Sequence, residues 1–252
     1  MVDFTFLAAF LLVFARISGF IAVFPLFALT GVPALLRLGL ALILALIITP
    51  VAGKGFVAPA AAGYVFALAN EVLFGLATGL TAALVFYALR MAGQLMGIQI
   101  GFAVAELLDP AGIQNNVVAE FVFFLGVIFF FSVDGHHAVI AALVRSFEMV
   151  PLTAGAVKSS VVPYVARLIG GMFSTALQLA APVLAVMVVV DLALGLMVRM
   201  VPQINVFMLG FPLKIAAGLL ILAGLLPVLG VVLRQLFDRM VADVLLLVRG
   251  LA

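Results

Sequence analysis

The chain has 252 residues, of which 68% are hydrophobic and 9% charged, and its formal net charge is +2. Soluble domains are about 45–50% apolar and about 25% charged, so a mean hydropathy of +1.47 indicates an integral membrane protein or part of a hydrophobic complex. The lack of cysteine excludes disulfides and thiolate metal sites, and the small net charge without a basic cluster argues against nucleic-acid binding.

Apolar segments follow one another along almost the whole chain. A spanning helix needs about 20 apolar residues, so the pattern predicts about six spans. The first segment opens with Asp3 and contains Arg16, unlike a cleaved signal peptide, and Met1 is therefore expected to be the mature start. We expect helices over 4–29, 34–53, 57–89, 117–133, 138–150, 164–201 and 206–233, and an amphipathic helix from Arg234 to Arg249.

Five charged residues lie within these apolar segments. An Arg or Asp at the bilayer centre costs roughly 2.5–3.5 kcal/mol on insertion scales, so such side chains should not face lipid. No partner within the chain is obvious from the sequence, and we expect partners in a protein assembly or a water-filled space. The residues are Arg16, Glu71, Arg167, Asp191 and Lys214.

Small residues recur every fourth position from Gly93 through Gly97 and Gly101 to Ala105. This spacing places them on one helix face, where another backbone can approach closely. The spacing reports closeness only, so packing within the chain and contact with a neighbouring subunit both stay open.

The densest polar stretch follows this helix. A helix that ends at Asp-Pro, a short polar loop and a new helix together predict a hairpin tip. Irregular backbone at membrane depth is tolerated only beside protein or water, so the loop either projects into an aqueous conduit or lies solvated outside the membrane. The stretch contains Glu106, Asp109, Pro110, Gly112, Gln114, Asn115, Asn116 and Glu120.

A second polar stretch, DLALGLMVRMVPQINVFMLGFPLK, covers residues 191–214. Pro202 cannot extend a helix without the loss of a backbone hydrogen bond, so we expect the helix to stop there and to restart at Phe207. The polar side chains should hold this hairpin against a neighbouring helix by charge-assisted hydrogen bonds. They are Asp191, Arg199, Gln203, Asn205 and Lys214.

The two histidines of the chain, His136 and His137, follow Asp134-Gly135. A metal site needs further convergent ligands, and adjacent side chains on a helix diverge, so we expect no metal site and interpret Asp134 as a helix N-cap. No phosphate-binding loop, Ser-His-Asp set or HExxH motif occurs. We therefore expect neither enzymatic activity nor a cofactor.

Three segments together resemble the FliR/SctT family of type III secretion export-gate subunits. They are GQLMGIQIGFAVAELLDP at 93–110, GHH at 135–137 with the following LVRSFEMVPL, and the stretch 191–214. The resemblance covers nearly the whole chain. Asp134 departs from it, because family members more often carry Asn before Gly-His.

The resemblance implies an all-α fold of membrane-type helical hairpins, packed in a closed assembly with FliP-like and FliQ-like subunits. Residues 1–160 would be the FliP-like part and residues 161–252 the FliQ-like hairpin. It implies a non-enzymatic part of the channel through which unfolded flagellar proteins cross the inner membrane, located in the flagellar basal body. FlhA-like and FlhB-like export proteins would be further partners, and the loop from Glu106 to Glu120 matches the family's central plug. From the residues alone, the competing hypothesis is a secondary transporter or ion channel that uses the broken helix near Pro202.

Overall fold

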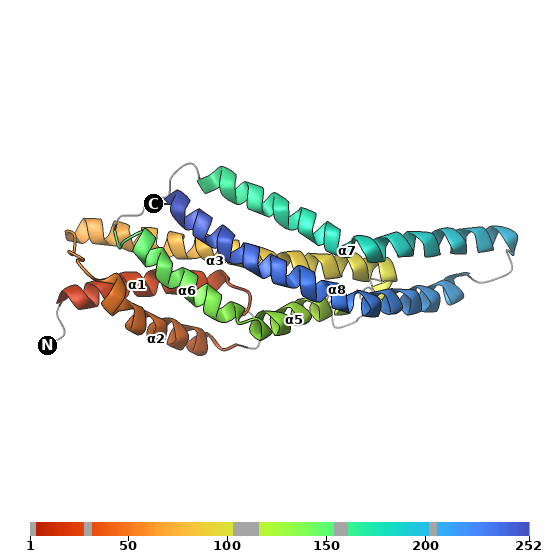
Figure 1. Cartoon of the computed structure of the whole chain (residues 1–252), viewed down its shortest axis with the longest axis horizontal. Coiled ribbons are helices and arrows are strands. Elements are labelled where there is room, and N and C mark those ends of the chain that lie inside the picture. Colours follow the sequence, from red (N-terminus) through yellow and green to blue (C-terminus); the bar gives the residue numbers. More distant parts are fainter. Residues whose placement is uncertain (1–3, 28–31, 103–115, 154–160, 202–205, 252) are drawn as a thin grey trace. The chain divides into compact units, whose positions relative to one another are not determined.

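The computed structural model describes residues 4–27, 32–102, 116–153, 161–201 and 206–251. Every regular element that these residues form is an α-helix (Figure 1), which confirms the all-α fold class. The helices are α1 (Phe4–Val23), α2 (Ala34–Ala52), α3 (Ala61–Ile100), α5 (Val117–Ser132), α6 (Gly135–Met149), α7 (Val161–Met200) and α8 (Val206–Leu251).

Five of these helices are long and apolar enough to cross a membrane. The pair α5 and α6 passes the same test together, with a bend of 72° between them, so the described chain has five spans, or six if the bent pair is one span. This agrees with the expected six. The helices α3 and α7 have 40 residues each and α8 has 46, because the glycine-rich stretch continues α3 and the segment after Arg234 continues α8.

The two predicted chain breaks are present. Helix α7 ends at Met200 and α8 begins at Val206, on either side of the break predicted at Pro202. Helix α5 ends at Ser132 and α6 begins at Gly135. Both breaks create junctions between long apolar helices at which polar side chains are concentrated.

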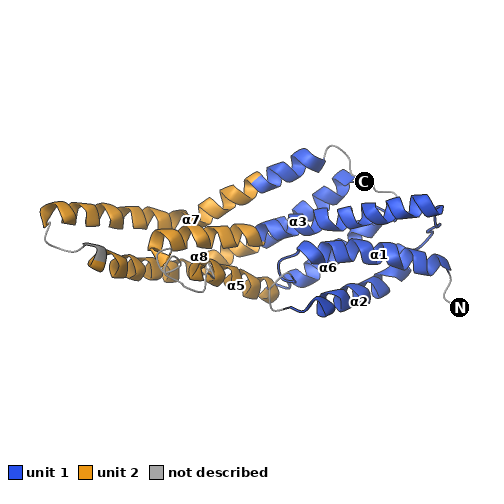
Figure 2. Ribbon diagram, turned by 180° about the vertical axis from the view of Figure 1, so that it is seen from behind, with its two compact units in different colours: residues 1–85, 133–169, 236–252 blue, residues 86–132, 170–235 orange. Residues whose placement is uncertain are grey.

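The chain divides into two compact units (Figure 2). Unit 1 comprises residues 1–85, 133–169 and 236–252, and unit 2 comprises residues 86–132 and 170–235. The helices α3, α7 and α8 each contribute to both units. These two units are defined by packing. The boundary expected after residue 160 instead separates a part that resembles FliP from a part that resembles FliQ, and it stays a prediction.

In unit 1, the backbones of α1 and α3 touch. A Cβ atom added at Gly75 would lie 2.0 Å from the carbonyl oxygen of Arg16, and one added at Gly79 would lie 2.7 Å from that of Phe20. Only glycine permits this separation. The same unit has an apolar cluster formed by Phe74, Val150, Val161, Leu247, Val248 and Leu251.

In unit 2, the core contains a group of aromatic side chains. The Phe86 ring meets the rings of Phe123 and Phe130 edge-on, with centroid distances of 6.2 and 5.5 Å. This geometry is favourable for aromatic pairs. The Cβ position of Gly93 lies 2.5 Å from the Cα atom of Ala119, so α3 and α5 also approach backbone to backbone.

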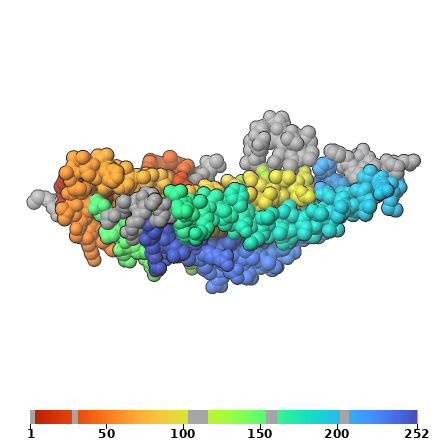
Figure 3. All heavy atoms as spheres, turned by 90° about the horizontal axis from the view of Figure 1, so that it is seen from above, coloured from red at the N-terminus to blue at the C-terminus, as the bar shows by residue number. Residues whose placement is uncertain are grey.

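Many large apolar side chains stay exposed on α7 and α8. Only 17% of the most apolar window of each helix is buried within the chain. In the space-filling view of Figure 3, α7 (green to cyan) is open to the viewer along much of its length. Apolar surface on this scale requires lipid or another protein to cover it.

Candidate functional site

A buried ion pair joins α1 to α3 in unit 1. The Arg16 side chain is 1% exposed and that of Glu71 is 4% exposed. Arg16 Nη2 donates to Glu71 Oε1 at 3.0 Å, and Arg16 Nε donates to the other carboxylate oxygen. The fork of the guanidinium thus meets both oxygens, which is the strongest arrangement for such a pair.

The same guanidinium caps the end of α6. Arg16 Nη1 donates to the carbonyl and hydroxyl oxygens of Ser146, and Nη2 donates to the carbonyl oxygen of Val150 at 3.1 Å. The last carbonyls of a helix have no partner within the helix, so Arg16 provides a donor for the Val150 carbonyl. It also gives a second donor to the Ser146 carbonyl, which already accepts from the Val150 N–H. With Glu71, these contacts account for the five N–H groups of an arginine. The rings of Phe74 and Phe147 each lie 4.2 Å from its central carbon.

In unit 2, the beginning of α5 is fastened to the glycine-rich part of α3. Asn116 Oδ1 accepts hydrogen bonds from the backbone N–H groups of Val118 and Ala119, as an N-cap does. A Cβ atom at Gly97 would lie 2.1 Å from this same oxygen. The close approach at Gly97 is therefore made within the chain and depends on a polar side chain of the next helix.

One helical turn further along α5, Glu120 accepts two hydrogen bonds from Arg90 of α3 at 2.9 and 3.2 Å. The two side chains are 31% and 39% exposed. The Arg90 guanidinium also lies over the Phe123 ring, 4.5 Å from its centroid. Asn116 and Glu120 thus both stabilise the α3–α5 contact, and their expected position at a lumen stays a prediction.

A second polar cluster joins three helices of unit 2. Lys214 Nζ of α8 lies 2.5 Å from Asp191 Oδ1 of α7, and Gln99 Nε2 of α3 donates to the other oxygen of Asp191 at 3.1 Å. Gly101, which follows α3 with a positive φ of 107°, has its Cβ position 3.2 Å from the ring of Phe211. The ion pair therefore joins α7 to α8, and the hydrogen bond from Gln99 together with the apolar contact of Phe211 attaches this hairpin to the end of α3.

The sequence indicated no obvious partner within the chain for Arg16, Glu71, Asp191 and Lys214. In the structure each of them has a charged partner within the chain, and their expected contacts in an assembly stay predictions. Helices that are distant in sequence bring the partners together. Arg199 is exposed at the end of α7, and its expected contact with a neighbouring helix stays a prediction. The other expected site residues, Glu106, Asp109, Pro110, Gly112, Gln114, Asn115, Gln203 and Asn205, lie outside the described residues.

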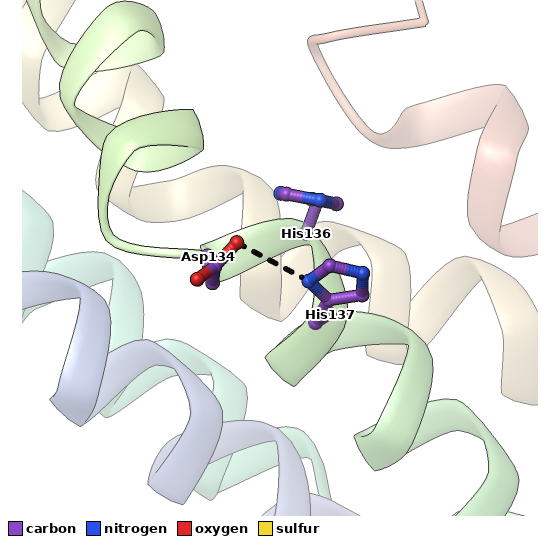
Figure 4. Close-up of side chains that lie close together, drawn as sticks. All are labelled: Asp134, His136 and His137. Carbon is purple, nitrogen blue, oxygen red and sulfur yellow. Dashed lines mark hydrogen bonds and ion pairs between the residues drawn. The ribbon is translucent and has the colours of Figure 1, made fainter.

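The junction of α5 and α6 carries a third polar group (Figure 4). Asp134 occupies the expected N-cap position of α6, but its side chain makes no capping hydrogen bond, and its backbone is left-handed with φ 56° and ψ 27°. Asp134 Oδ1 instead lies 3.3 Å from Nδ1 of His137. The expectation that the histidine side chains diverge is wrong, because the ring centroids of His136 and His137 are 4.1 Å apart.

Several contributors to these sites carry no signal in the sequence. The carbonyl groups of Ser146 and Val150 are acceptors that any residue provides. Gln99 is one of two glutamines near the end of α3, and the sequence does not distinguish it from Gln94. Asn116 could have been recognised, because an Asn directly before an apolar helical segment is typical of an N-cap.

Together, these features define an α-helical, multi-pass membrane protein in which a buried ion pair and glycine contacts join helices that are distant in sequence. The chain matches the family described as "Bacterial export proteins, family 1" over residues 7–240, and it belongs to that family.

Several similar proteins bear the name "Flagellar biosynthetic protein FliR". The protein from Bacillus subtilis (strain 168) is 36% identical over 234 residues, which are 91% of this chain and 90% of that protein. The one from Pectobacterium carotovorum subsp. carotovorum is 33% identical over 236 residues, 92% of this chain and 90% of that protein. The one from Escherichia coli (strain K12) is 30% identical over 234 residues, with coverages of 91% and 90%.

Proposed function

We propose that this chain is a subunit of the flagellar type III protein export gate and forms part of the channel through which unfolded flagellar proteins cross the inner membrane. The observation that carries the proposal is the family match over residues 7–240, together with relatives named for flagellar biosynthesis that align with about nine-tenths of the chain. A multi-pass helical chain fits this role. Nothing favours a secondary transporter or ion channel that works alone.

The role proposed here is non-enzymatic and requires partners. The exposed apolar faces of α7 and α8 support the need for partners, because an isolated chain beside an aqueous conduit would leave these faces uncovered. The proposed neighbours are FliP-like and FliQ-like subunits in a closed helical assembly, with FlhA-like and FlhB-like export proteins associated. Residues 1–160 would take a FliP-like place in it, and residues 161–252 a FliQ-like place.

The proposal gives the loop between α3 and α5 the role of a plug. Its two ends support a hairpin loop, since Gly97 of α3 touches Asn116 at the start of α5. The Gly101 contact with Phe211 holds the end of α3 against α8 as well. A loop with a closed base can move without disturbing the helices that carry it, as reversible closure requires.

Copurification tests the assembly. A gate subunit should leave the membrane together with its FliP-like and FliQ-like partners, whereas an autonomous transporter should be recovered alone. Recovery of the intact chain alone from flagellated cells, under conditions that preserve other membrane complexes, would contradict the proposal.

Deletion of residues 112–115 tests the plug. We expect normal assembly and a raised leak of ions through membranes that carry the complex, because the loop blocks the path and does not drive transport. Deletion of the equally long stretch 155–158, between α6 and α7, is the matched control. An unchanged leak with normal assembly would contradict the plug role, while the proposed assembly would be unaffected by that result.

A further inference from the structure

The α5–α6 junction places three potential metal ligands together. Asp134, His136 and His137 each offer one ligand atom, and these atoms all lie within 4.8 Å of one another. Figure 4 shows the Asp134 carboxylate directed at the His137 ring, with the His136 ring beside it. Asp134 and His137 are exposed and His136 is partly buried, so an ion from solution can reach them.

The two histidine rings lie together although they are adjacent on a helix. Successive residues of a helix are about 100° apart around its axis, which would separate His136 from His137. These residues belong to the first turn of α6, where their rings lie 4.1 Å apart and 37° from parallel. The left-handed conformation of Asp134 places its carboxylate over the same turn.

We propose that Asp134, His136 and His137 form a binding site for a divalent transition-metal ion of the Zn²⁺, Ni²⁺ or Cu²⁺ class. Two imidazole nitrogens and one carboxylate suit these ions, whereas Ca²⁺ and Mg²⁺ require shells made of oxygen. Ligand atoms around tetrahedral Zn²⁺ are about 3.3–3.6 Å apart for bonds of about 2.0–2.2 Å. The pair Asp134 Oδ1 and His137 Nδ1 already has 3.3 Å, and side-chain rotation can bring in the third ligand.

The charges at this place allow an ion to bind. The N-terminus of α6 carries partial positive charge, which disfavours cations, but this effect is modest at an exposed site and is screened by salt. Asp134 supplies a full negative charge against it. Three ligands from one chain leave further coordination positions for water or for a group from another molecule.

An ion at this site would have a structural role. It would tie the N-cap position of α6 to the first turn of that helix and so stabilise the start of α6. The inference does not depend on the proposed export function. The alternative reading is an Asp134–His137 hydrogen bond that binds no ion, and the experiment separates the two.

The test is metal binding by the full chain in detergent, together with its copurified partners, purified with an affinity tag that contains no histidine. Zn²⁺ binding is measured by calorimetry, and Co²⁺ serves as a spectroscopic probe because its visible absorption reports nitrogen and oxygen ligands. The variants are His137→Gln, His136→Gln and Asp134→Asn, where Asn tolerates the left-handed conformation and preserves the turn. Glu148→Gln, at an exposed position of the same helix, is the control.

We expect saturable binding of one Zn²⁺ per chain, lost in both histidine variants, at least about tenfold weaker in Asp134→Asn, and unchanged in Glu148→Gln. The absence of saturable binding in the unmodified protein would overturn the proposal. So would binding that survives both His137→Gln and Asp134→Asn, because the ion would then lie elsewhere. His137 and Asp134 are exposed, so these two variants keep the test decisive if His136→Gln does not fold.

Discussion

The substitution Glu71→Gln should destabilise unit 1 far more than its small change in shape suggests. Arg16 is fully buried, and Glu71 supplies two of its acceptors as well as its counter-charge. Glutamine has almost the same size as glutamate but no charge, and its amide nitrogen would face a guanidinium nitrogen. The variant therefore leaves a buried arginine without its counter-charge.

The expected magnitude follows from the burial of the pair. Removal of one partner of a buried ion pair costs about 3–5 kcal/mol, against a total stability of about 5–15 kcal/mol for a typical domain. At about 2–4 °C per kcal/mol for a chain of this size, the midpoint of thermal denaturation should fall by roughly 6–20 °C. The Ser146 and Val150 carbonyls still accept from Arg16, which favours the lower part of this range.

The matched control is Glu120→Gln, which breaks the half-exposed pair with Arg90. Exposed pairs contribute about 0–1 kcal/mol, so this variant should lose at most a few degrees. The chain has no tryptophan, so the assay is the fraction of monodisperse protein that survives heating, measured by size exclusion in one detergent. An equal fall in the denaturation midpoint of the two variants would refute the reasoning, because burial would then not determine how much an ion pair contributes to stability.

Three further predictions concern packing and assembly. Gly97→Leu should disrupt the α3–α5 contact at a cost of about 1–3 kcal/mol and impair secretion. The control Gly39→Leu should be tolerated, because the Cβ position of Gly39 has nothing within 4 Å. Normal assembly of the Gly97→Leu variant would count against a tight contact. Asp191→Ala should lower recovery of the assembled complex more than the control Leu192→Ala, whose side chain is 64% exposed at the neighbouring position. Equal recovery of the two variants would show that the ion pair between Asp191 and α8 is dispensable. Expressed without its partners, the chain should aggregate or be degraded because of the apolar faces of α7 and α8. Coexpression of the partners should rescue it. A monodisperse, long-lived monomer in mild detergent would contradict this prediction.

The presence of the helices and several of their ends could be predicted from the sequence because these depend on local properties, whereas the continuity of α3 to Ile100 and of α8 to Leu251 was not predicted. Hydropathy and proline placement located the break near Pro202 and the bend at Asp134-Gly135, and the structure has helix ends at both places. The four-residue glycine spacing predicted a close contact along α3, and Gly93 and Gly97 meet α5 there. These signals are contained in short windows of sequence.

The pairing of charges could not be predicted in this way. Arg16 and Glu71 are 55 residues apart, and one sequence does not indicate which distant helices adjoin. The other acceptors of Arg16 are backbone carbonyls, which are identical for every residue type. For the histidines, the prediction failed because the directions in which adjacent side chains leave a helix do not fix where their rings lie, and the two rings approach to 4.1 Å.

The partners of the buried arginine are synthesised well after it. Arg16 emerges in the first helix, whereas Glu71 follows 55 residues later and Ser146 follows 130 residues later. At about 5–20 residues per second, the carboxylate arrives roughly 3–11 s after the arginine, and the end of α6 arrives roughly 6–26 s after it. Until Glu71 has been made, the first helix carries an unpaired charge that lipid disfavours. It must therefore remain in contact with water or with the insertion machinery during that first interval, and the full set of Arg16 acceptors is complete only when more than half of the chain has been made.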